Sequence, residues 1–574
     1  MHSERLVKYY FAISKIFSHP FLPSIQRSLK TGTYLRKKIL FGCRPSYHLL
    51  SKNAEKDTVM SRLKRFLYNA SLLTLTSLAM RAVSLGFGIW LSNRVGPEAI
   101  GLFTLISGVY GFALTLATSG ISLAVTRMVA EALGHEDHGR VRAAMRRCLS
   151  YALFFGSLSM VLLLTLAEPI GLHWLGDTRT VIPLRLMSST LPLIALCSAL
   201  NGYFTAVRRV VKNAASQMLE QALKIGVTVF LIISVLPGGI ENACIALVLG
   251  GVVSELFSFF VMVSMFLIDK KRHISKSGKE ANGKEITRNL LGIALPVALS
   301  AYVRSALLSV EHALIPIGLK KSGSSHERAL AAYGTLSGMA LPIVTFPMAL
   351  ISSFAGMTVP ELSDCLARGH QNRVRYIAGR VWQFSLLFSI GVSGILICFS
   401  GELGAVLYSS SEAGGYISLL APLIPIMYLD HTTDALLKGL GQQLYSMTVN
   451  IVDAAASTLL VWLLVPHYGI AGYIFVIIAM EIVNFGLSAV RMLNLSGMKP
   501  RLVCWVLKPT LCIIGSTSIT RLVFSRLPLS FPTPLTLTIH IAASALIYLF
   551  LLRLIRAFDA EDREWLKSII NRSA

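Results

Sequence analysis

Charged side chains are scarce in this chain. Only 14% of its 574 residues are Asp, Glu, Lys or Arg, whereas 54% are hydrophobic, and the mean hydropathy is +0.63. Soluble domains carry roughly 25% charged residues, so the composition excludes an ordinary water-soluble protein. Apolar stretches of about 20 residues, the length that crosses the hydrocarbon core of a bilayer, recur from about residue 66 onward. The sequence therefore predicts a protein that spans a membrane many times.

Motifs of catalysis and metal binding are missing as well. No P-loop, H-E-x-x-H or G-x-S-x-G motif occurs, so we expect neither an ATPase nor a hydrolase, and no cofactor or metal. The eight cysteines stand singly without a C-x-x-C pair, which argues against a disulfide framework and a zinc site. Barrel strands alternate apolar and polar residues, but the segment 151–167 is apolar on every face and is typical of a helix.

Acidic residues are the rarer of the charged types. The 29 Asp and Glu face 54 Lys and Arg, which gives a formal net charge of +25. The cations do not form one stripe with exposed aromatic residues. They stand in short loops between apolar runs, which is the pattern of topology determinants. We therefore expect membrane lipids, and not nucleic acid, around this chain.

The apolar runs predict an all-α membrane protein with about fourteen transmembrane helices. We place them at 66–92, 99–130, 143–167, 182–206, 214–236, 242–268, 288–318, 329–360, 376–399, 416–438, 446–466, 470–492, 503–524 and 533–555. The loops after even-numbered helices hold 23 Lys and Arg, and the loops after odd-numbered helices hold seven. The positive-inside rule then predicts a multi-pass protein of the inner (plasma) membrane with both termini in the cytoplasm.

The start of the chain differs from the rest. Residues 1–59 hold eleven Lys and Arg against three Asp and Glu and contain no spanning stretch. We predict a disordered basic cytoplasmic extension, or a start codon placed upstream of Met60; a transit peptide is the alternative. Beyond it we expect a six-helix lobe at 60–287, a second at 288–499, and helices 13 and 14 with a cytoplasmic tail at 500–574.

The two predicted lobes carry traces of an internal repeat. An offset of 233 residues superposes these pairs: Arg140 and Arg373, Gly101 and Gly334, Glu220 and Asp453. With an offset shorter by ten residues, Arg81 falls on Arg304. Secondary transporters are commonly built from such repeats, with the substrate held between them near the midplane.

Two arginines stand inside predicted spans. Arg81 lies about fifteen residues into helix one, and Arg304 lies a similar distance into helix seven. An ionisable side chain at mid-bilayer costs at least ~2.5–3.5 kcal/mol, so it normally faces a cavity or a partner. We expect both guanidinium groups to bind a diphosphate in a central cavity, because the planar fork bonds phosphate oxygens in pairs. The alternative is a structural role, in which each arginine snorkels or caps a neighbouring helix.

Carboxylates and imidazoles also occur within predicted spans. As residues for ion or proton coupling, or as polar groups of the cavity, we single out Glu220, Glu311, His312, Asp430, His431, Asp434 and Asp453. Glu220 has an alternative role, since Lys224 can pair with it four residues later on the same helix. Glu311 and His312 can instead lie in water at the outer mouth. Glu255 and Glu481 are single and are expected to pack across helices.

Six segments, in this order along the chain, resemble a known family. They are 120–131 (GISLAVTRMVAE), 333–342 (YGTLSGMALP), 359–363 (VPELS), 421–430 (APLIPIMYLD), 438–442 (KGLGQ) and 466–470 (PHYGI). Over about residues 61–555 the chain resembles the stage V sporulation protein B group of polysaccharide-biosynthesis membrane proteins. That group belongs to the multidrug/oligosaccharidyl-lipid/polysaccharide superfamily, with the lipid II flippases and the O-antigen flippases.

The resemblance implies two six-helix lobes in a V around a cationic central cavity, with two appended helices. It also implies alternating access to an undecaprenyl-diphosphate-linked sugar. Helix-one arginines line the cavity of lipid II flippases, and Arg81 matches the first of them. Phe87 stands where the second would be, six residues on. This departure leaves lipid-linked glycans other than lipid II open as the substrate.

We therefore expect a flippase rather than an enzyme. Its cargo would be a polyprenyl-diphosphate-linked saccharide, a precursor of the cell wall, the spore cortex or a surface polysaccharide, moved by an ion gradient or the membrane potential. Two alternatives stay open. A drug or cation antiporter of the same superfamily would need an acidic cavity. A non-transporting scaffold for a polysaccharide or peptidoglycan synthesis enzyme would need no continuous polar cavity.

Overall fold

A computed structural model describes residues 47–135, 137–235, 239–273, 283–525 and 534–555, with the side chains from residue 76 onward apart from Val210, Val235, His273 and Ser525. Every regular element within these ranges is a helix, which confirms the predicted all-α fold. Residues 64–574 form one compact unit, separate from residues 1–63. The predicted extension 1–59 lies largely outside the described residues, as does most of the predicted C-terminal tail.

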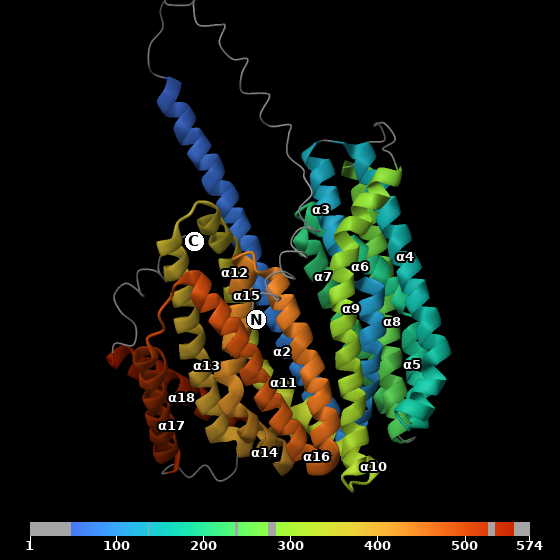
Figure 1. Cartoon of the computed structure of the whole chain (residues 1–574), viewed down its shortest axis with the longest axis vertical. Helices are drawn as coiled ribbons and strands as arrows, with labels where there is room; N and C mark the ends of the chain where they lie inside the picture. The colour runs from blue at the N-terminus through green and yellow to red at the C-terminus, as the bar shows by residue number, and fades with distance from the viewer. Residues whose placement is uncertain (1–46, 136, 236–238, 274–282, 526–533, 556–574) are drawn as a thin grey trace, which may run out of the picture. The chain divides into compact units, whose positions relative to one another are not determined.

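The first half of the chain forms one group of helices. Its elements are α2 (Tyr47–Thr118), α3 (Ile121–Gly134), α4 (His138–Pro169), the π-helix η1 (Ile170–Trp174), the 3-10 turn η2 (Thr178–Thr180), α5 (Val181–Ser188), α6 (Leu191–Ala206), α7 (Val210–Val235) and α8 (Ile240–His273). The main packing partners are α7 with α8, and α6 with α3 and α4. Figure 1 shows α4, α6 and α8 side by side.

The second half forms another group. Its elements are α9 (Gly283–Lys321), α10 (His326–Tyr333), the π-helix η4 (Gly334–Ala340), α11 (Leu341–Thr345), α12 (Met348–Ala367), α13 (Gln371–Tyr408), α14 (Ser411–Leu420), the 3-10 turn η5 (Ala421–Leu423), α15 (Ile424–Gly439), α16 (Gln443–Ser496), the π-helix η6 (Val503–Leu507), α17 (Lys508–Ser525) and α18 (Pro534–Leu554). In this group α13 packs on α14, α15 and α17, and α12 packs on α15 (Figure 1).

Ten helices in the described ranges are long and apolar enough to cross a membrane, or twelve when each of two bent pairs counts as one span. Two of the ten are 59 and 54 residues long, more than twice the length of one crossing. Each is interrupted by glycine in a non-helical conformation, at Gly96 and again near its end at Gly120 in the first, and at Gly469 in the second. If each is counted as two spans, the total agrees with the predicted fourteen, and the number fourteen stays a prediction.

The two bent pairs have a local cause. The second part of each broken span begins at a proline, whose missing N–H group is tolerated only in the first turn of a helix. Pro192 is the second residue of α6, which meets α5 at 44°. Pro347 is the N-cap of α12, which meets α11 at 53°. The chain therefore bends within these two spans at fixed positions.

The long helix α9 contacts both groups. It packs most extensively on α16, and near its start it packs on α3 and α4. The predicted boundary between the lobes, at residues 287 and 288, would thus assign to the second lobe a helix that the first group also holds. The division into two six-helix lobes with two appended helices, and their arrangement in a V, stay predictions.

The two groups also meet where α2 crosses the end of α10 and the start of η4. A Cβ atom on Gly101 would overlap the carbonyl group of Leu330, and a Cβ atom on Gly334 would overlap the carbonyl oxygen of Pro97. Backbone therefore touches backbone at this crossing, and no side chain has room there. Gly101 and Gly334 are also a pair that the 233-residue offset superposes. A contact between equivalent residues is what a twofold relation between the halves would produce.

The crossing predicts a difference between two glycines of α2. Gly101→Ala should lower the free energy of unfolding by about 1–3 kcal/mol, since overpacking a close contact forces the backbone to shift. Gly86→Ala is the matched control, because no atom lies within 4 Å of a Cβ built there. The measurement is the melting temperature in detergent. Equal melting temperatures for the two variants would show that the crossing is not tight.

Candidate functional site

The second part of α2 lies alongside α9. Ser309 donates a hydrogen bond to the carbonyl oxygen of Gly108 at 2.7 Å, and the Ser305 hydroxyl lies 3.0 Å from that of Thr115. Arg304 immediately precedes Ser305 on α9. Because successive residues of a helix are rotated by about 100°, Arg304 projects from a different face than the residues of this seam.

Arg81 and Arg304, the predicted diphosphate ligands, both have exposed side chains. Arg304 lies close enough to Asp430 and Asp453 for its charge to act on both carboxyl groups. Arg81 acts in the same way on His431. Since Asp430 and His431 are consecutive residues of α15, both arginines lie near the same turn of that helix. Their role as phosphate ligands stays a prediction.

Carboxylates gather next to Arg304. Asp453 of α16 interacts electrostatically with Asp430, with Glu311 of α9 and with Glu481, which lies further along α16. The positive charge predicted from Arg81 and Arg304 therefore has negatively charged groups beside it. Glu481 is expected from the sequence to pack across helices, and its sequence surroundings do not show that two carboxylates, those of Asp430 and Asp453, lie nearby.

Asp430 and Asp453 differ from the other predicted coupling residues in their hydrogen bonding. In each, the Oδ1 atom is buried and has no hydrogen-bond partner among the described residues. A buried polar atom without a partner is costly. A proton or a small cation would remove that cost, so these two carboxylates are the best placed of the predicted coupling residues.

Glu311 and His312 are adjacent in α9 but have different neighbours. Ser457 of α16 donates a hydrogen bond to the Glu311 carboxylate at 2.9 Å. The Nδ1 atom of His312 lies 2.8 Å from the hydroxyl of Tyr333, and its ring lies against Gly108 of α2. Of the two residues, Glu311 alone therefore interacts with the Asp453 carboxylate, and His312 belongs to the contact between α9, α10 and α2.

His431 and Asp434 are held by neighbours in the second group. Ser352 Oγ of α12 lies 2.8 Å from Nε2 of His431. Lys438 pairs with Asp434 at 2.6 Å, four residues later on α15. Because this lysine compensates its charge, Asp434 is less suited to hold a coupling ion than Asp430.

Glu220 belongs to a second polar group, between α7 and α8. Its carboxylate accepts a hydrogen bond from Ser258 of α8 at 2.7 Å. Glu255 of α8 lies close enough to Glu220 and to Lys224 for their charges to act on it. The expected pairing of Glu220 with Lys224 on one helix is thus part of a group that also joins two helices.

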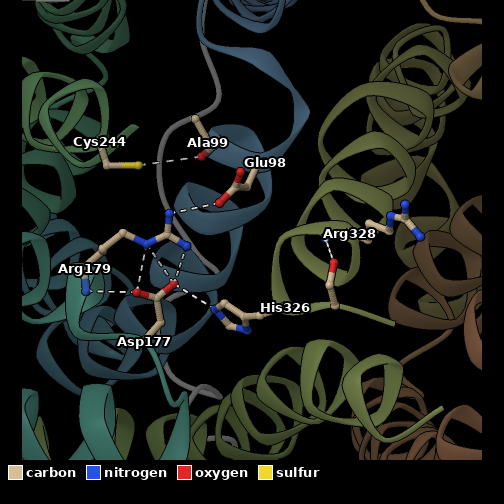
Figure 2. Close-up of polar contacts among 8 residues, drawn as sticks. Glu98, Ala99, Asp177, Arg179, Cys244, His326 and Arg328 are labelled. Atoms are coloured by element: carbon tan, nitrogen blue, oxygen red, sulfur yellow. Dashed lines mark hydrogen bonds and ion pairs between the residues drawn. The ribbon is translucent and has the colours of Figure 1, made fainter. Parts of the chain in front are cut away.

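A charged cluster joins the two groups of helices where η2, the start of α10 and the bend at Gly96 come together (Figure 2). Arg179 donates to the Asp177 carboxylate through Nε and Nη2, at 3.0 and 2.8 Å, and to Glu98 through Nη1 at 2.9 Å. The Nε2 atom of His326 lies 2.9 Å from the same Asp177 carboxylate. We call these four residues the Asp177 cluster. Three of them belong to the first half, and His326 belongs to α10.

The Asp177 side chain lies at the centre of this cluster and is only 4% exposed. It also accepts a hydrogen bond from the backbone N–H of Arg179. Charge-assisted hydrogen bonds on both sides satisfy the buried carboxylate, so the cluster ties η2 to α2 and to α10. In the sequence Arg179 was only one of the few cations in loops after odd-numbered helices. The available signal was the acid two residues before it.

The surroundings of Asp177 also change the pKa of its carboxyl group. Burial raises the pKa of this carboxyl group, but the hydrogen bonds from Arg179 and His326 outweigh burial and hold the pKa below its ordinary value of 3.8. The carboxylate therefore stays charged at neutral and mildly acidic pH, and the cluster is a permanent ionic contact in that range.

Two family models match the sequence. The model described as polysaccharide biosynthesis protein matches residues 66–366, just over half of the chain, and the model described as MatE matches residues 322–463. The match confirms the resemblance inferred from the motifs.

Relatives in Bacillus subtilis (strain 168) agree with these matches. Its stage V sporulation protein B is 26% identical over 504 residues, which cover 87% of this chain and 96% of the relative. Its lipid II flippase MurJ is 22% identical over 426 residues, which cover 69% of this chain and 76% of the relative. The chain thus matches its relatives over most of their length.

Solved structures share the fold. The lipid II flippase MurJ in an inward closed conformation matches with a TM-score of 0.63 at 14% identity, over 84% of this chain and 98% of that chain. A multidrug resistance MATE family transporter of the MOP superfamily, in an inward-facing conformation, matches with a TM-score of 0.57 at 17% identity. The match covers 74% of this chain and 99% of that chain. These likenesses confirm the predicted type of helical membrane fold.

The Asp177 cluster predicts that one amide substitution loosens the contact between α10 and the first group. Cys244 is a natural reporter, since its thiol is fully buried and donates to the Ala99 carbonyl oxygen next to Glu98. Asp177→Asn should raise the rate at which a maleimide labels Cys244 several-fold, measured by peptide mass spectrometry. The control is Glu168→Gln, which removes the ion pair between Glu168 and Arg185. This pair lies at the surface, since the Glu168 side chain is 58% exposed. Unchanged labelling in Asp177→Asn would contradict the role of the cluster.

The depressed pKa of Asp177 predicts a pH dependence of stability. A carboxyl group whose pKa is lowered by folding contributes stability above its unfolded value of 3.8, and loses it as the pH falls through the folded pKa. The difference in melting temperature between the wild type and Asp177→Asn should therefore persist from about pH 8 to pH 5 and shrink below 3.8. A difference that already vanishes near pH 6 would mean that another group titrates.

Proposed function

The chain belongs to the polysaccharide biosynthesis protein family, and from this membership we propose that it is a flippase that carries a polyprenyl-diphosphate-linked saccharide across the bilayer. Among its relatives, stage V sporulation protein B matches over 96% of its length, and the lipid II flippase MurJ is named for the same kind of cargo. The saccharide would be a precursor of the cell wall, the spore cortex or a surface polysaccharide.

One observation carries this proposal. Two arginines from different halves of the chain, Arg81 and Arg304, lie near one turn of α15 with exposed side chains, within helices long enough to span a membrane. Among the described residues neither guanidinium group forms an ion pair, so both are available to bind phosphate oxygens in pairs. A diphosphate between the two arginines would place the most polar part of a lipid-linked saccharide inside the membrane with its charge compensated.

An apolar groove supports the lipid part of the cargo. It encloses about 890 Å³ between α13, α15, α16 and α17, and its lining includes Trp382, Ile390, Leu429, Phe485 and Ile513. Burial of apolar surface is favourable by roughly 25 cal/mol per Å². A polyprenyl chain that follows this groove would remain in apolar surroundings while the headgroup moves.

The carboxylates beside Arg304 give the proposal a coupling mechanism. The charge of Arg304 acts on Asp430 and Asp453 when no substrate is bound. A diphosphate bound to Arg304 would compensate that charge and leave the two carboxylates without a counter-charge. They would then take up a proton or a cation, which links substrate binding to an ion gradient. Moving one charge through 100 mV supplies a further ~2.3 kcal/mol.

The Asp177 cluster and the crossing of Gly101 with Gly334 hold the two halves together at one end of the helices. That end carries the loops poor in Lys and Arg, so we place it outside the cell membrane and both termini in the cytoplasm. The conformation is then closed to the outside. Release of cargo to the outside requires the ionic contacts of the Asp177 cluster to part, which is the outward step of alternating access.

A second candidate function is cation or drug antiport. It is favoured by the group of Glu311, Asp430, Asp453 and Glu481 and by the MatE match to residues 322–463. An antiporter would bind a cationic substrate at these carboxylates and would not need Arg81.

The arginines provide the test of the flippase proposal. Arg81→Ala and Arg304→Ala should each abolish translocation of a fluorescent polyprenyl-diphosphate saccharide in proteoliposomes, because an unpaired diphosphate is too costly to bury, while membrane insertion stays normal. Arg94→Ala, an exposed arginine at the end of the first span, is the control and should keep full activity. Normal translocation by either the Arg81 or the Arg304 variant would refute the role of that arginine.

The two candidate functions predict different effects of one substitution, Asp453→Asn. Asp453→Asn should leave binding of the polyprenyl-diphosphate saccharide intact or stronger and should remove the dependence of transport on the ion gradient. In an antiporter the same change should abolish binding of the cationic substrate. Measuring both ligands with the wild type and the variant separates the alternatives, since an antiporter would show no binding of the anionic lipid at all.

A further inference from the structure

A pocket opens between α3, α4 and the start of α9, away from the residues assigned to transport. It encloses about 540 Å³, within the roughly 300–1,000 Å³ of small-molecule sites. Its charged lining comes from three helices: Arg127 and Glu131 from α3, Arg140 from α4, and Arg288 from α9. Part of this lining belongs to the segment 120–131, whose role the proposed function leaves open.

The pocket is cationic. Among the lining residues three guanidinium groups face a single carboxylate, that of Glu131. Arg140 also approaches Glu285 at 3.5 Å, but this carboxylate is 60% exposed, and such a pair is weak. In the part of the chain that the structure describes, neither Arg127 nor Arg288 forms an ion pair with a carboxylate. Two of its three arginines are therefore available to a ligand.

Two other basic residues at this end of the helices are already engaged by a carboxylate. Arg209 and Lys212 both pair with Asp269, a carboxylate whose side chain is only 1% exposed. Positive charge near a membrane end therefore does not by itself define a site. The Arg127 pocket combines a cavity with arginines that lack such a partner.

The position of the pocket indicates the chemistry of its ligand. It lies at the end of the helices that carries the Arg- and Lys-rich loops, where the positive-inside rule predicts the cytoplasmic headgroup layer. The N-termini of α4 and α9, at His138 and Gly283, add partial positive charge to it. Rigid guanidinium forks bind phosphate oxygens in pairs, and basic pockets between membrane helices on this side are suited to phosphorylated headgroups.

We propose that the Arg127 pocket binds a phosphate-bearing anion, which can be the headgroup of an anionic membrane lipid or a soluble phosphate compound. Because its arginines come from α3, α4 and α9, a bound phosphate group bridges the first helix of the second half to the first group. The ligand holds α9 in the position seen here. The pocket excludes Arg81 and Arg304, so the site stands whether or not the transported substrate is a lipid-linked saccharide.

The test measures binding to the purified full-length chain in detergent. Native mass spectrometry with phosphatidylglycerol, and with phosphatidylcholine as the lipid of zero net charge, should show one tightly held phosphatidylglycerol. Arg127→Gln and Arg288→Gln should each weaken its binding about tenfold, the effect of one lost charge-assisted hydrogen-bond pair. Arg146→Gln, an exposed arginine of α4 outside the pocket, is the matched control and should bind as the wild type does.

A second variant tests the cavity without changing any charge. Gly292 lines the pocket, and a Cβ atom there meets no other atom within 4 Å, so Gly292→Leu should fold and should block binding.

Equilibrium dialysis with inorganic pyrophosphate distinguishes a soluble phosphate compound from a lipid headgroup as the ligand. Pyrophosphate binding that the same variants abolish identifies a soluble anion, and phosphatidylglycerol binding alone identifies a lipid. Unchanged binding in all three pocket variants, or equal retention of both lipids by the wild type, would overturn the proposal.

Discussion

The central constraint on this molecule is that a charge between apolar helices needs a partner. Water is absent from the hydrocarbon layer and from the tightly packed interior of the protein, and each ionised group without compensation there costs several kcal/mol. The chain meets the constraint in two ways. Asp177 is enclosed by Arg179 and His326, so its charge is compensated inside the protein. Asp430 and Asp453 each keep a buried oxygen without a hydrogen-bond partner among the described residues, so their compensation must come from Arg304 or from outside the chain. The first arrangement holds the structure together, and the second leaves a place for a ligand.

The sequence predicts the type of fold and the residues that belong to it better than it predicts their partners. Long apolar runs require helices, because lipid offers the backbone no hydrogen bonds, and the structure agrees. The identity of Asp453 as a candidate also followed from its place in an apolar run. Its neighbour Glu481 did not, because the two residues meet through the packing of helices and not through sequence spacing. Asp434 shows the opposite case, since Lys438 follows at the helical spacing of four residues and the pairing is local.

Adjacent residues illustrate why the remaining details need coordinates. Glu311 and His312 have the same depth in one apolar run, and the sequence assigns them one role. In the structure the rotation of about 100° per residue turns Glu311 toward Ser457 and His312 toward Tyr333. The Asp177 cluster is hidden for a related reason, because Glu98, Arg179 and His326 are far apart in the chain and each is an ordinary loop charge by itself.

The contact between Gly101 and Gly334 has a mechanical consequence. Because two backbones meet there with no side chain between them, the helices can tilt against each other without any side chain changing its rotamer. The crossing lies at one end of the helices, so it acts as a fulcrum near one edge of the bilayer. A tilt of roughly 10° about a fulcrum at one edge of a ~30 Å hydrocarbon layer moves the opposite edge by about 5 Å. Small angular changes at this point are thereby converted into a wide displacement at the far surface of the membrane.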